Sequence, residues 1–421
     1  MDSESEIDVP PFFLCPISLQ IMKDPVILPT GITYDRDSIE RWLGNNNKTC
    51  PVTKQPIPPD ADLTPNIILR RLIQSWCTLN ASHGFHCIPT PRPPASRAQI
   101  SKLIHSATSS SSHHSQIKCL RQLKSLAKES EANKRSIESA GAVDFLASVV
   151  VNFNHDSELD CIEQFGSSPC DEALSLLHGL HISEPALKDL VNRNGEFVDS
   201  LTRVMQRGTY ESRAYAVQIS KSMLHMADPL RIIGIRTGFF GEVVQLVRDQ
   251  ISKQASKAAL GLLIEMCPWG RNRVKAVESG AVSVLVDLLL DSSERRACEM
   301  ALAALDVLCQ CAEGRAEFVK HAAGLAVVSK KILRVSTVAT EKAVRILLSV
   351  GKSSATAAVL QEMLQIGVVA KLCLVLQVEG SGRAKDKARE VLRLHARVWK
   401  NSPCVPPTLL SSYPAARGLR W

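Results

Sequence analysis

A spacing of 42 to 44 residues that recurs four times constrains the fold of this chain more than any other feature. Glycine followed by apolar residues recurs at Gly141, Gly195, Gly238, Gly280, Gly324 and Gly367, with separations of 54, 43, 42, 44 and 43 residues by subtraction of the residue numbers. Long segments rich in Ala and Leu, such as "KAALGLLIEMC" and "MALAALDVLCQC", keep nearly the same period. The longer first interval contains the polar, turn-rich stretch "NFNHDSELDCIEQFGSSP", which we interpret as an inserted loop. Two independent features with one period indicate a repeat architecture.

One repeat unit is clearest between residues 271 and 314. It reads as a short helix "RNRVKAVESG" closed by Gly280, a second helix "AVSVLVDLLLD", and a long third helix "SERRACEMALAALDVLCQCAEG". Glycine suits the turn between the first two helices because it accepts a positive φ at no steric cost. Val284, Leu285, Leu288 and Leu289 form one wide apolar face. Three helices cannot bury that face alone, so neighbouring units must stack into a superhelix.

This pattern resembles the armadillo repeat and covers residues 116–400, in five to six units. In armadillo proteins of the importin type, the third helices carry a Trp and an Asn that hold a basic peptide. The positions that match the Trp are Ser175, Gln218, Gly261, Ala303 and Arg345, and those that match the Asn are Gly179, Ser222, Glu265, Val307 and Ser349. The Trp and Asn ladder is absent, which argues against a nuclear import receptor. The candidate substrate groove is therefore assigned to Gln218, Ser222, Glu265 and Arg345.

The length and composition predict more than one folded region. A chain of 421 residues exceeds the size at which one hydrophobic core keeps growing. A high hydrophobic content of 45% with only 5% aromatic residues favours stacked helices over a β-sandwich. The stretches "TPRPPASR" and "SATSSSSHHS" indicate a linker. The predicted organisation is an acidic tail over 1–10, a compact unit over 11–80, a Pro- and Ser-rich linker over 81–115, a helical solenoid over 116–400 and a C-terminal tail over 401–421.

The N-terminal unit combines a hairpin with helices. The stretch "DPVILPTGITYD" predicts two short strands joined by a turn at Gly31. Asp35 is placed to cap the helix "RDSIERWLGN", on which Ile39, Trp42 and Leu43 share a face.

A second helix is predicted in "LTPNIILRRLIQSWC". Thr64 is the expected N-cap and Pro65 the expected first helical residue. The expected buried side consists of Leu69, Leu72, Ile73 and Trp76.

The phrases "CPIS", "DPV", "TGITYDR", "SIERWL", "CPVTKQP" and "LTPNIILRRLI" follow one another in an order that resembles the U-box, the RING-like fold without zinc. The expected fold class is thus a small α+β U-box followed by an all-α armadillo-repeat solenoid. The resemblance implies that hydrogen bonds and salt bridges replace the metal, among residues such as Asp24, Tyr34, Asp35, Arg36 and Asp37. Cys15 and Cys50 are then expected to be small buried hydrophobes.

A zinc-bound RING finger is the alternative for this unit. A structural zinc site needs four Cys or His ligands in closely spaced pairs, and the chain contains no C-x-x-C pair. His83, His86 and Cys87 lack a nearby fourth ligand. We therefore expect no metal ion and no cofactor.

A U-box joined to armadillo repeats resembles the plant U-box ubiquitin ligases of the armadillo class. The resemblance implies that a ubiquitin-loaded conjugating enzyme docks on the U-box while the solenoid holds a protein substrate. By the same resemblance, the conjugating enzyme would contact Ile17, Leu19, Trp42, Pro51 and Lys54. Lys54 stands where efficient ligases often have Arg, which offers a planar fork of donors that Lys lacks. No covalent catalytic residue is expected, since the carrier enzyme supplies the activated carbonyl.

A second hypothesis is a non-enzymatic scaffold whose U-box only mediates dimerisation. A homodimer is left open under the first hypothesis as well.

Composition also bears on location and on other partners. Thirteen cysteines with irregular spacing, no secretory segment after "MDSESEIDVP", and no long apolar run predict a chain in a reducing compartment without membrane insertion. A net charge of +8 without a basic block is mild, so nucleic acid is not an expected partner. A cytoplasmic location is expected, with nuclear or peripheral membrane association left open. The resemblance also implies a role in stress and immune signalling.

Overall fold

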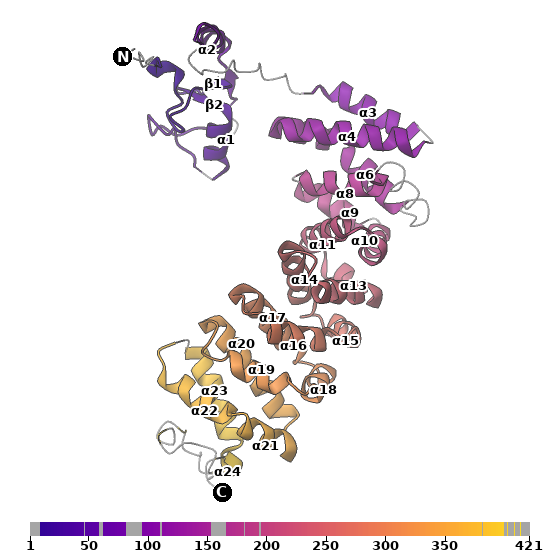
Figure 1. Ribbon diagram of the computed structural model, residues 1–421, viewed down its shortest axis with the longest axis vertical. Helices are drawn as coiled ribbons and strands as arrows, with labels where there is room; N and C mark the ends of the chain where they lie inside the picture. Colours follow the sequence, from indigo (N-terminus) through magenta and orange to yellow (C-terminus); the bar gives the residue numbers. More distant parts are fainter. Residues whose placement is uncertain are drawn as a thin grey trace, which may run out of the picture. The chain divides into compact units, whose positions relative to one another are not determined.

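The computed structural model describes residues 9–45, 47–58, 62–80, 95–109, 112–152, 166–180, 182–192, 195–380 and 382–399, together with residues 402, 408 and 413 (Figure 1). The chain divides into two compact units, Met1–Pro94 and Ala95–Trp421.

The first unit contains a small antiparallel sheet with helices. In chain order its elements are η1 (Pro11–Phe13), β1 (Pro25–Ile27), β2 (Thr33–Asp35), α1 (Arg36–Gly44), β3 (Thr64–Pro65) and α2 (Ile67–Leu79). The strand order is β2-β1-β3, and both neighbours run antiparallel to β1. Gly31 has a φ of +80° in the turn between β1 and β2, as the sequence predicts. Where the turn demands a left-handed backbone, glycine is the residue with least strain.

A separate hydrophobic core supports this first unit. Its buried members come from η1, β1, β2, α1, α2 and the segments between them, and they are Phe13, Cys15, Met22, Val26, Leu28, Tyr34, Ile39, Cys50, Ile57, Ile73 and Cys77. Trp42 and Leu43 pack against this core from α1, on the face that the helical spacing predicts.

The start of the second helix differs from the sequence prediction. Thr64 and Pro65 do not begin α2; they pair with Ile27 and Val26 as strand β3. Asn66 caps the helix instead, and its Oδ1 accepts a hydrogen bond of 3.1 Å from the backbone of Leu69. The prediction was wrong because pairing with β1 satisfies the backbone that a helix would otherwise have used.

The buried face of α2 is also narrower than expected. Leu72 is 52% exposed, whereas Ile73 and Cys77 point into the core. Leu72 lies four residues after the exposed Ile68, so both occupy the outer side of the helix.

The second unit consists of helices that follow one another from α3 to α24 (Figure 1). It begins with α3 (Arg97–Ser109) and α4 (His113–Glu129). Its described residues then form six three-helix units: α5 (Glu131–Ser139), α6 (Ala142–Val151) and α8 (Pro169–Gly179); α9 (Glu184–Asn192), α10 (Glu196–Arg207) and α11 (Tyr210–His225); α12 (Pro229–Gly234), α13 (Thr237–Asp249) and α14 (Lys253–Met266); α15 (Gly270–Glu278), α16 (Ala281–Asp291) and α17 (Arg295–Leu308); α18 (Ala312–Lys320), α19 (Gly324–Lys331) and α20 (Thr337–Ser353); and α21 (Ala357–Gln365), α22 (Val368–Gln377) and α23 (Gly382–Leu394), before the short α24 (Ala396–Trp399).

Helix α4 and the third helices of the units pack on one another in sequence. Each of α4, α8, α11, α14, α17 and α20 contacts the next helix in this series, which ends with α23. One continuous core runs through the units, and the predicted face of Val284, Leu285, Leu288 and Leu289 is buried in it. The stacking that a single unit needs is therefore present.

The six glycines that recur with the repeat period fall into two groups. Between first and second helices, four glycines adopt a φ of 76° to 82°, namely Gly141, Gly195, Gly280 and Gly367. Gly238 and Gly324 do not: the first lies inside α13 and the second begins α19. The turn before α13 is made by the extended residues Ile235 and Arg236 instead.

The ends of the solenoid reach beyond the predicted limits. Helix α3 lies within the expected linker over 81–115, and its Ile100 and Ala107 are buried in the solenoid core. Apolar residues at a spacing of seven let α3 cover one side of α4. At the other end, Tyr413 of the expected tail is buried and its hydroxyl donates to the Leu392 carbonyl at 2.9 Å. His83, His86 and Cys87 lie outside the described residues.

Among the described helices, none is by itself both long and apolar enough to cross a membrane, while one bent pair, Ala357–Gln365 with Val368–Gln377, meets both criteria together.

Candidate functional site

Two loops of the first unit have the same backbone geometry. In the first loop, the Cys15 N–H donates to the Gln20 carbonyl at 2.8 Å; in the second, the Cys50 N–H donates to the Gln55 carbonyl at 2.8 Å. Isolated bridges flank the loops in matching places, between residues 14 and 21 and between residues 49 and 56. The sequences "CPISLQ" and "CPVTKQ" lie 35 positions apart by subtraction, so each residue of one loop has a counterpart in the other.

Leu19 and Lys54 are counterparts, and both adopt a left-handed backbone. Their φ angles are +56° and +60°, and their N–H groups donate to the Cys15 and Cys50 carbonyls at 2.8 and 2.9 Å. Leu19 is 74% exposed and Lys54 is exposed. Non-glycine residues with positive φ are uncommon and cluster at functional sites. Each tight loop thus presents one side chain outward.

The Cys50 thiol is the centre of a buried hydrogen-bond cluster. The Tyr34 hydroxyl lies 3.0 Å from Cys50 Sγ, and the Thr30 hydroxyl donates to the same sulfur at 3.4 Å. The Val52 N–H donates to the Tyr34 oxygen at 3.2 Å, so Tyr34 joins the Cys50 sulfur to the backbone of the second loop. Burial alone would raise the pKa of Cys50, but hydrogen bonds from Thr30, Thr53 and Tyr34 lower it to about 6. Burial and the bond to Cys50 raise the pKa of Tyr34.

Cys15 has a related environment in the first loop. The Asp35 N–H donates to Cys15 Sγ at 3.3 Å. Burial opposes ionisation, yet hydrogen bonds from the backbone of Asp35, Ser18 and Ile17 lower the pKa of the Cys15 thiol overall. Both cysteines are buried as expected, but the description as plain hydrophobes was incomplete because each sulfur accepts several hydrogen bonds.

Asp24 and Asp35 brace the hairpin against both helices. The Asp24 carboxylate accepts from Arg36 Nε at 2.6 Å and also pairs with Arg70 of α2. One oxygen of Asp35 accepts from the backbone N–H groups of Lys23 and Asp24, at 2.7 and 2.9 Å. Burial, the largest influence, raises the pKa of Asp35. These contacts tie the segment before β1 to the end of β2 and to α1 and α2.

Asp37 does not belong to this network, contrary to the expectation. It is exposed in the first turn of α1, and within the described part of the chain its carboxylate has no hydrogen bond or ion pair. Its position fits a favourable interaction with the helix N-terminus, which is a local effect.

Trp42 connects α1 to the second loop. Its indole Nε1–H donates to the Thr49 carbonyl at 2.9 Å, and its ring packs half-buried against the core. The residue therefore both shapes the second loop and contributes apolar surface beside it.

Val52 is a surface residue that the sequence analysis missed. It is 51% exposed in the second loop and is the counterpart of the half-buried Ile17 in the first. Together with Leu19 and the half-buried Pro51, these side chains give the two loops an apolar character. The repeated loop sequence was the signal that could have identified Val52.

The solenoid's candidate groove residues lie on the third helices α11, α14 and α20, and each has a polar contact. Gln218 Oε1 of α11 accepts a hydrogen bond of 3.1 Å from His178 Nε2 of α8. Glu265 of α14 lies 3.5 Å from His225 of α11. Ser222 is exposed and donates to the Gln218 carbonyl at 3.3 Å.

Arg345 of α20 is also engaged across the units. Its Nε lies 3.1 Å from Asp306 of α17, and Lys342 reaches the same carboxylate at 3.2 Å. The Asp306 side chain is only 4% exposed, and burial raises its pKa although both cations oppose that shift. The predicted groove residues Gln218, Glu265 and Arg345 thus help to join neighbouring units.

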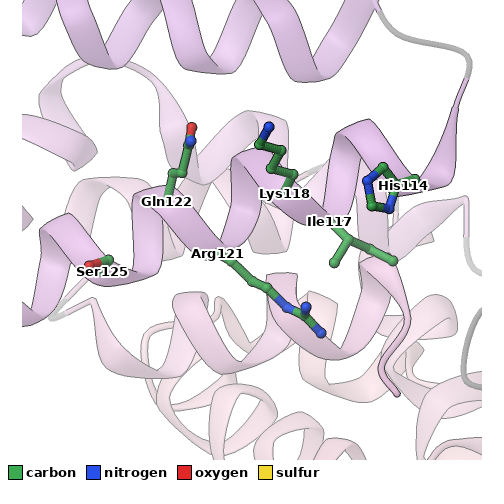
Figure 2. Close-up of a pocket in the computed structure, with 6 residues that line it drawn as sticks. All are labelled: His114, Ile117, Lys118, Arg121, Gln122 and Ser125. Carbon is green, nitrogen blue, oxygen red and sulfur yellow. The ribbon is translucent and has the colours of Figure 1, made fainter. Parts of the chain in front are cut away.

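A hollow of about 350 Å³ lies along α4 near the start of the solenoid (Figure 2). Its described lining is His114, Ile117, Lys118, Arg121, Gln122 and Ser125. In Figure 2 the Arg121 side chain extends away from Lys118 and Gln122, and it donates to Glu172 of α8 at 3.0 Å. Arg121 is therefore committed to the junction with the next unit.

Comparisons with known proteins agree with this two-part architecture. The U-box domain model matches residues 9–82, and the model for the plant U-box protein ARM repeat region matches residues 99–415. In Arabidopsis thaliana, E3 ubiquitin-protein ligase PUB23 is 58% identical over 98% of both chains. E3 ubiquitin-protein ligase PUB22 of the same plant is 55% identical over 98% of this chain and 100% of its own length.

Solved structures support the fold of the solenoid. A structure from a study of the interaction between cadherin and β-catenin has a TM-score of 0.58 at 13% identity, covering 78% of this chain and 58% of that one. An engineered protein has a TM-score of 0.51 at 16% identity, covering 82% of this chain and 88% of its own. At these identities the likeness concerns the fold alone.

Proposed function

Because this chain belongs to the plant family of U-box proteins with an armadillo-repeat region, we propose a division of its labour between docking loops and solenoid. The chain is an E3 ubiquitin-protein ligase of the RING type. Its U-box receives a ubiquitin-conjugating enzyme, and its armadillo repeats hold a protein substrate.

The transfer itself needs no nucleophile from this chain. A substrate lysine amine attacks the thioester carbonyl that joins ubiquitin to the conjugating enzyme. An isopeptide bond forms, the thiolate of the conjugating enzyme leaves, and the amine gives up a proton. The ligase contributes proximity and orientation, which can account for several kcal/mol of the barrier.

The two equivalent loops are the proposed docking surface. Ile17, Leu19 and Val52 offer exposed or half-exposed apolar area, and Pro51 keeps the second loop rigid. Trp42 adds its ring beside Thr49 and anchors the second loop. Shallow apolar contacts of this kind suit a partner that must dissociate after each transfer.

Lys54 is the proposed cation that contacts the loaded conjugating enzyme. Its left-handed backbone directs an exposed, charged side chain outward from the second loop. The observation that supports the docking proposal is that Lys54 and Leu19 occupy equivalent positions in the two loops, with the same left-handed backbone and exposed side chains.

A substitution at Val52 tests the docking surface without disturbing the core. Val52→Glu places a charge on a 51% exposed side chain, so we expect the fold to persist while discharge of the ubiquitin thioester slows by about tenfold or more. Single-turnover discharge to free lysine, with purified full-length chain and loaded conjugating enzyme, measures this effect. Trp42→Ala is less informative because it also removes the bond to Thr49.

Val338→Glu is the matched control. Val338 is 54% exposed on α20, so the same change in charge there should leave discharge at the wild-type rate. Equal rates for Val52→Glu and the unaltered chain would contradict the docking surface.

We also propose a homodimer through the outer face of α2. Ile68, Leu72 and Leu79 are 76%, 52% and 82% exposed and lie on this helix, an amount of apolar surface that a second copy would cover. Sedimentation of the full chain, with Leu72→Glu as the comparison, tests the proposal.

A cytoplasmic location and a role in plant stress and immune signalling complete the proposal. The buried free thiols of the described residues, such as Cys15 and Cys267, suit a reducing compartment. The signalling role rests on family resemblance, and imaging of a fluorescent fusion in plant cells under stress would test both statements.

A further inference from the structure

The third unit of the solenoid has an unusually short first helix. The first helices α5, α9, α15, α18 and α21 each span nine residues, whereas α12 spans six and buries none of them. The unit also lacks the left-handed glycine turn, because Ile235 and Arg236 are extended there. Less helix is therefore available to cover the preceding unit.

The following unit holds the short helix in place. Asn272 Nδ2 donates to the Ile232 carbonyl at 2.8 Å, and Lys275 Nζ donates to the carbonyls of Ile233 and Ile235 at 3.0 and 2.5 Å. Asn272 is fully buried, so its bonds fix the C-terminal end of α12 firmly. The C-terminal end of the short helix is therefore held by hydrogen bonds from the following unit.

A pocket of about 270 Å³ opens where the short helix leaves its neighbours uncovered. The described lining comes from α9 to α13. Its apolar members are Val191, Val198, Leu224, Leu230, Ile235 and Phe239. Cavities for drug-sized ligands generally begin at about 300 Å³, so this volume fits one or two side chains of a protein segment better than a cofactor.

The charged residues of this pocket are mostly basic. Asp199, Arg231 and Arg236 line it, and Arg236 lies 3.1 Å from Asp199 with 79% of its side chain exposed. No acidic side chain of the described residues pairs with Arg231. Leu230, 84% exposed, lines the same opening. An unpaired cation beside apolar surface favours an occupant that is apolar and negatively charged.

We propose that this pocket binds a short segment of a partner protein in which a bulky apolar side chain is flanked by carboxylates. The apolar side chain enters between Val198, Leu224 and Phe239. A flanking carboxylate pairs with Arg231. This inference rests on the proposed function, since it names the chemistry of a segment that the solenoid would hold. Peptide binding is measured without a conjugating enzyme, so its failure is distinguishable from a failure of ubiquitin transfer.

The test uses the full chain and a fluorescein-labelled synthetic peptide with one central leucine between pairs of aspartates. Fluorescence anisotropy should show saturable binding that weakens by about tenfold or more in Arg231→Glu, because reversal of one rim charge turns attraction into repulsion. Since α12 buries no residue, this variant should keep the wild-type circular dichroism spectrum. Arg248→Glu, an exposed change on α13 away from the pocket lining, should bind the peptide normally.

Two altered peptides separate the apolar and charged parts of the proposal. Replacing the central leucine by alanine should also weaken binding by about tenfold. A peptide with lysines in place of aspartates should bind Arg231→Glu better than it binds the unaltered chain. Absence of binding by the leucine peptide would overturn the proposal, as would equal binding of the alanine peptide or an equal loss in Arg248→Glu.

Discussion

At the scale of single residues, the two cysteines of the U-box act as hydrogen-bond acceptors at the start of two equivalent loops. Each thiol has a lowered pKa because hydrogen bonds outweigh the effect of burial. A zinc ion would have held such sulfurs as thiolates; here hydroxyl and N–H groups stabilise them instead. The loops keep their shape through these bonds and through the Asp24 network.

Removal of the Asp24 charge should destabilise the U-box. Asp24→Asn weakens the pairs with both Arg36 and Arg70, whose side chains are largely buried, so we expect a loss of about 1–3 kcal/mol in the free energy of unfolding. Urea unfolding of the full chain, followed by hydrogen exchange of U-box peptides, measures it. Asp37→Asn is the matched control and should cost less, about 0.3–1 kcal/mol, since the Asp37 carboxylate is unpaired among the described residues and interacts only with the N-terminus of α1. A loss as large in Asp37→Asn would show that helix-dipole effects dominate.

The Cys50 thiol should make U-box stability depend on pH. Its pKa in the folded chain is about 6, below the ordinary value of 9.0. The stabilisation is therefore complete above pH 9 and is lost as the pH falls through about 6, with a slope of at most about 1.4 kcal/mol per pH unit.

Cys50→Ser provides the comparison for this pH effect, because serine accepts the same hydrogen bonds but does not ionise in that range. Protection of U-box amides from hydrogen exchange, corrected for intrinsic rates, should rise more steeply between pH 6 and 9 in the unaltered chain than in the variant, in which only the Cys15 thiol still has a lowered pKa. Parallel profiles for the two proteins would rule out the thiolate.

At the scale of elements, the repeat period predicted the helices well because each unit must bury the same apolar faces. The unit of α15, α16 and α17 follows the predicted order, with Gly280 in the expected turn. Gly238 and Gly324 have the same spacing in the sequence but do not adopt the left-handed backbone of the other four glycines, since a glycine also fits inside a helix or at its start. Spacing alone does not distinguish these uses.

The sequence was less informative about strand β3 and about which side chains bond between neighbouring units. Strand β3 depends on pairing with β1 from distant sequence, which no local pattern reveals. The bonds of Gln218, Glu265 and Arg345 to neighbouring units depend likewise on how the third helices stack. Within the U-box, the family resemblance indicated Asp24, Tyr34, Asp35 and Arg36, while the partners Arg70 and Thr30 emerged only from the fold.

Two glycine substitutions should have opposite effects on the solenoid. Gly280→Ala forces a side chain into a φ of +81° and should cost about 1–2 kcal/mol. Gly241→Ala, inside α13 with open space around the new methyl group, should gain about 0.5–1 kcal/mol. The midpoint of urea unfolding, followed by far-ultraviolet circular dichroism, reports both. Similar midpoints for the two variants would show that the turn at Gly280 tolerates a side chain.

At the scale of the whole molecule, the solenoid's third helices are linked by ion pairs as well as by apolar packing. Glu172 of α8 binds Arg121 and Lys124 of α4, Asp306 joins α17 to α20, and Glu390 joins α23 to Lys352 at 2.5 Å. In a linear array each unit depends on its immediate neighbours. Loss of one such pair should therefore have a local effect.

Glu172→Gln tests this locality. Burial opposes ionisation of Glu172, but hydrogen bonds from Lys124 and Arg121 lower its pKa overall. Its stabilisation is present above the ordinary pKa of 4.5 and is lost as the pH falls through the lowered value. At pH 7 the variant should exchange amides about tenfold faster in α4 and α8 than the unaltered chain, with α20 and α23 unchanged.

The two proteins should become alike in strong acid, where both side chains are neutral. Glu317→Gln is the control, because its pair with Lys320 is exposed and contributes little. Faster exchange along the entire solenoid in Glu172→Gln would contradict the local coupling and indicate a single cooperative array.

The shortened helix α12 makes one repeat unit different from its neighbours, and this difference can fix the register of a segment bound along the solenoid. In a superhelix of interchangeable steps, an extended guest could slide by one step and meet nearly identical surroundings. A repeat unit whose first helix is shorter than the others removes this ambiguity, because a bound segment can match it in only one register. A guest anchored there would present the same lysines at the same height on every encounter.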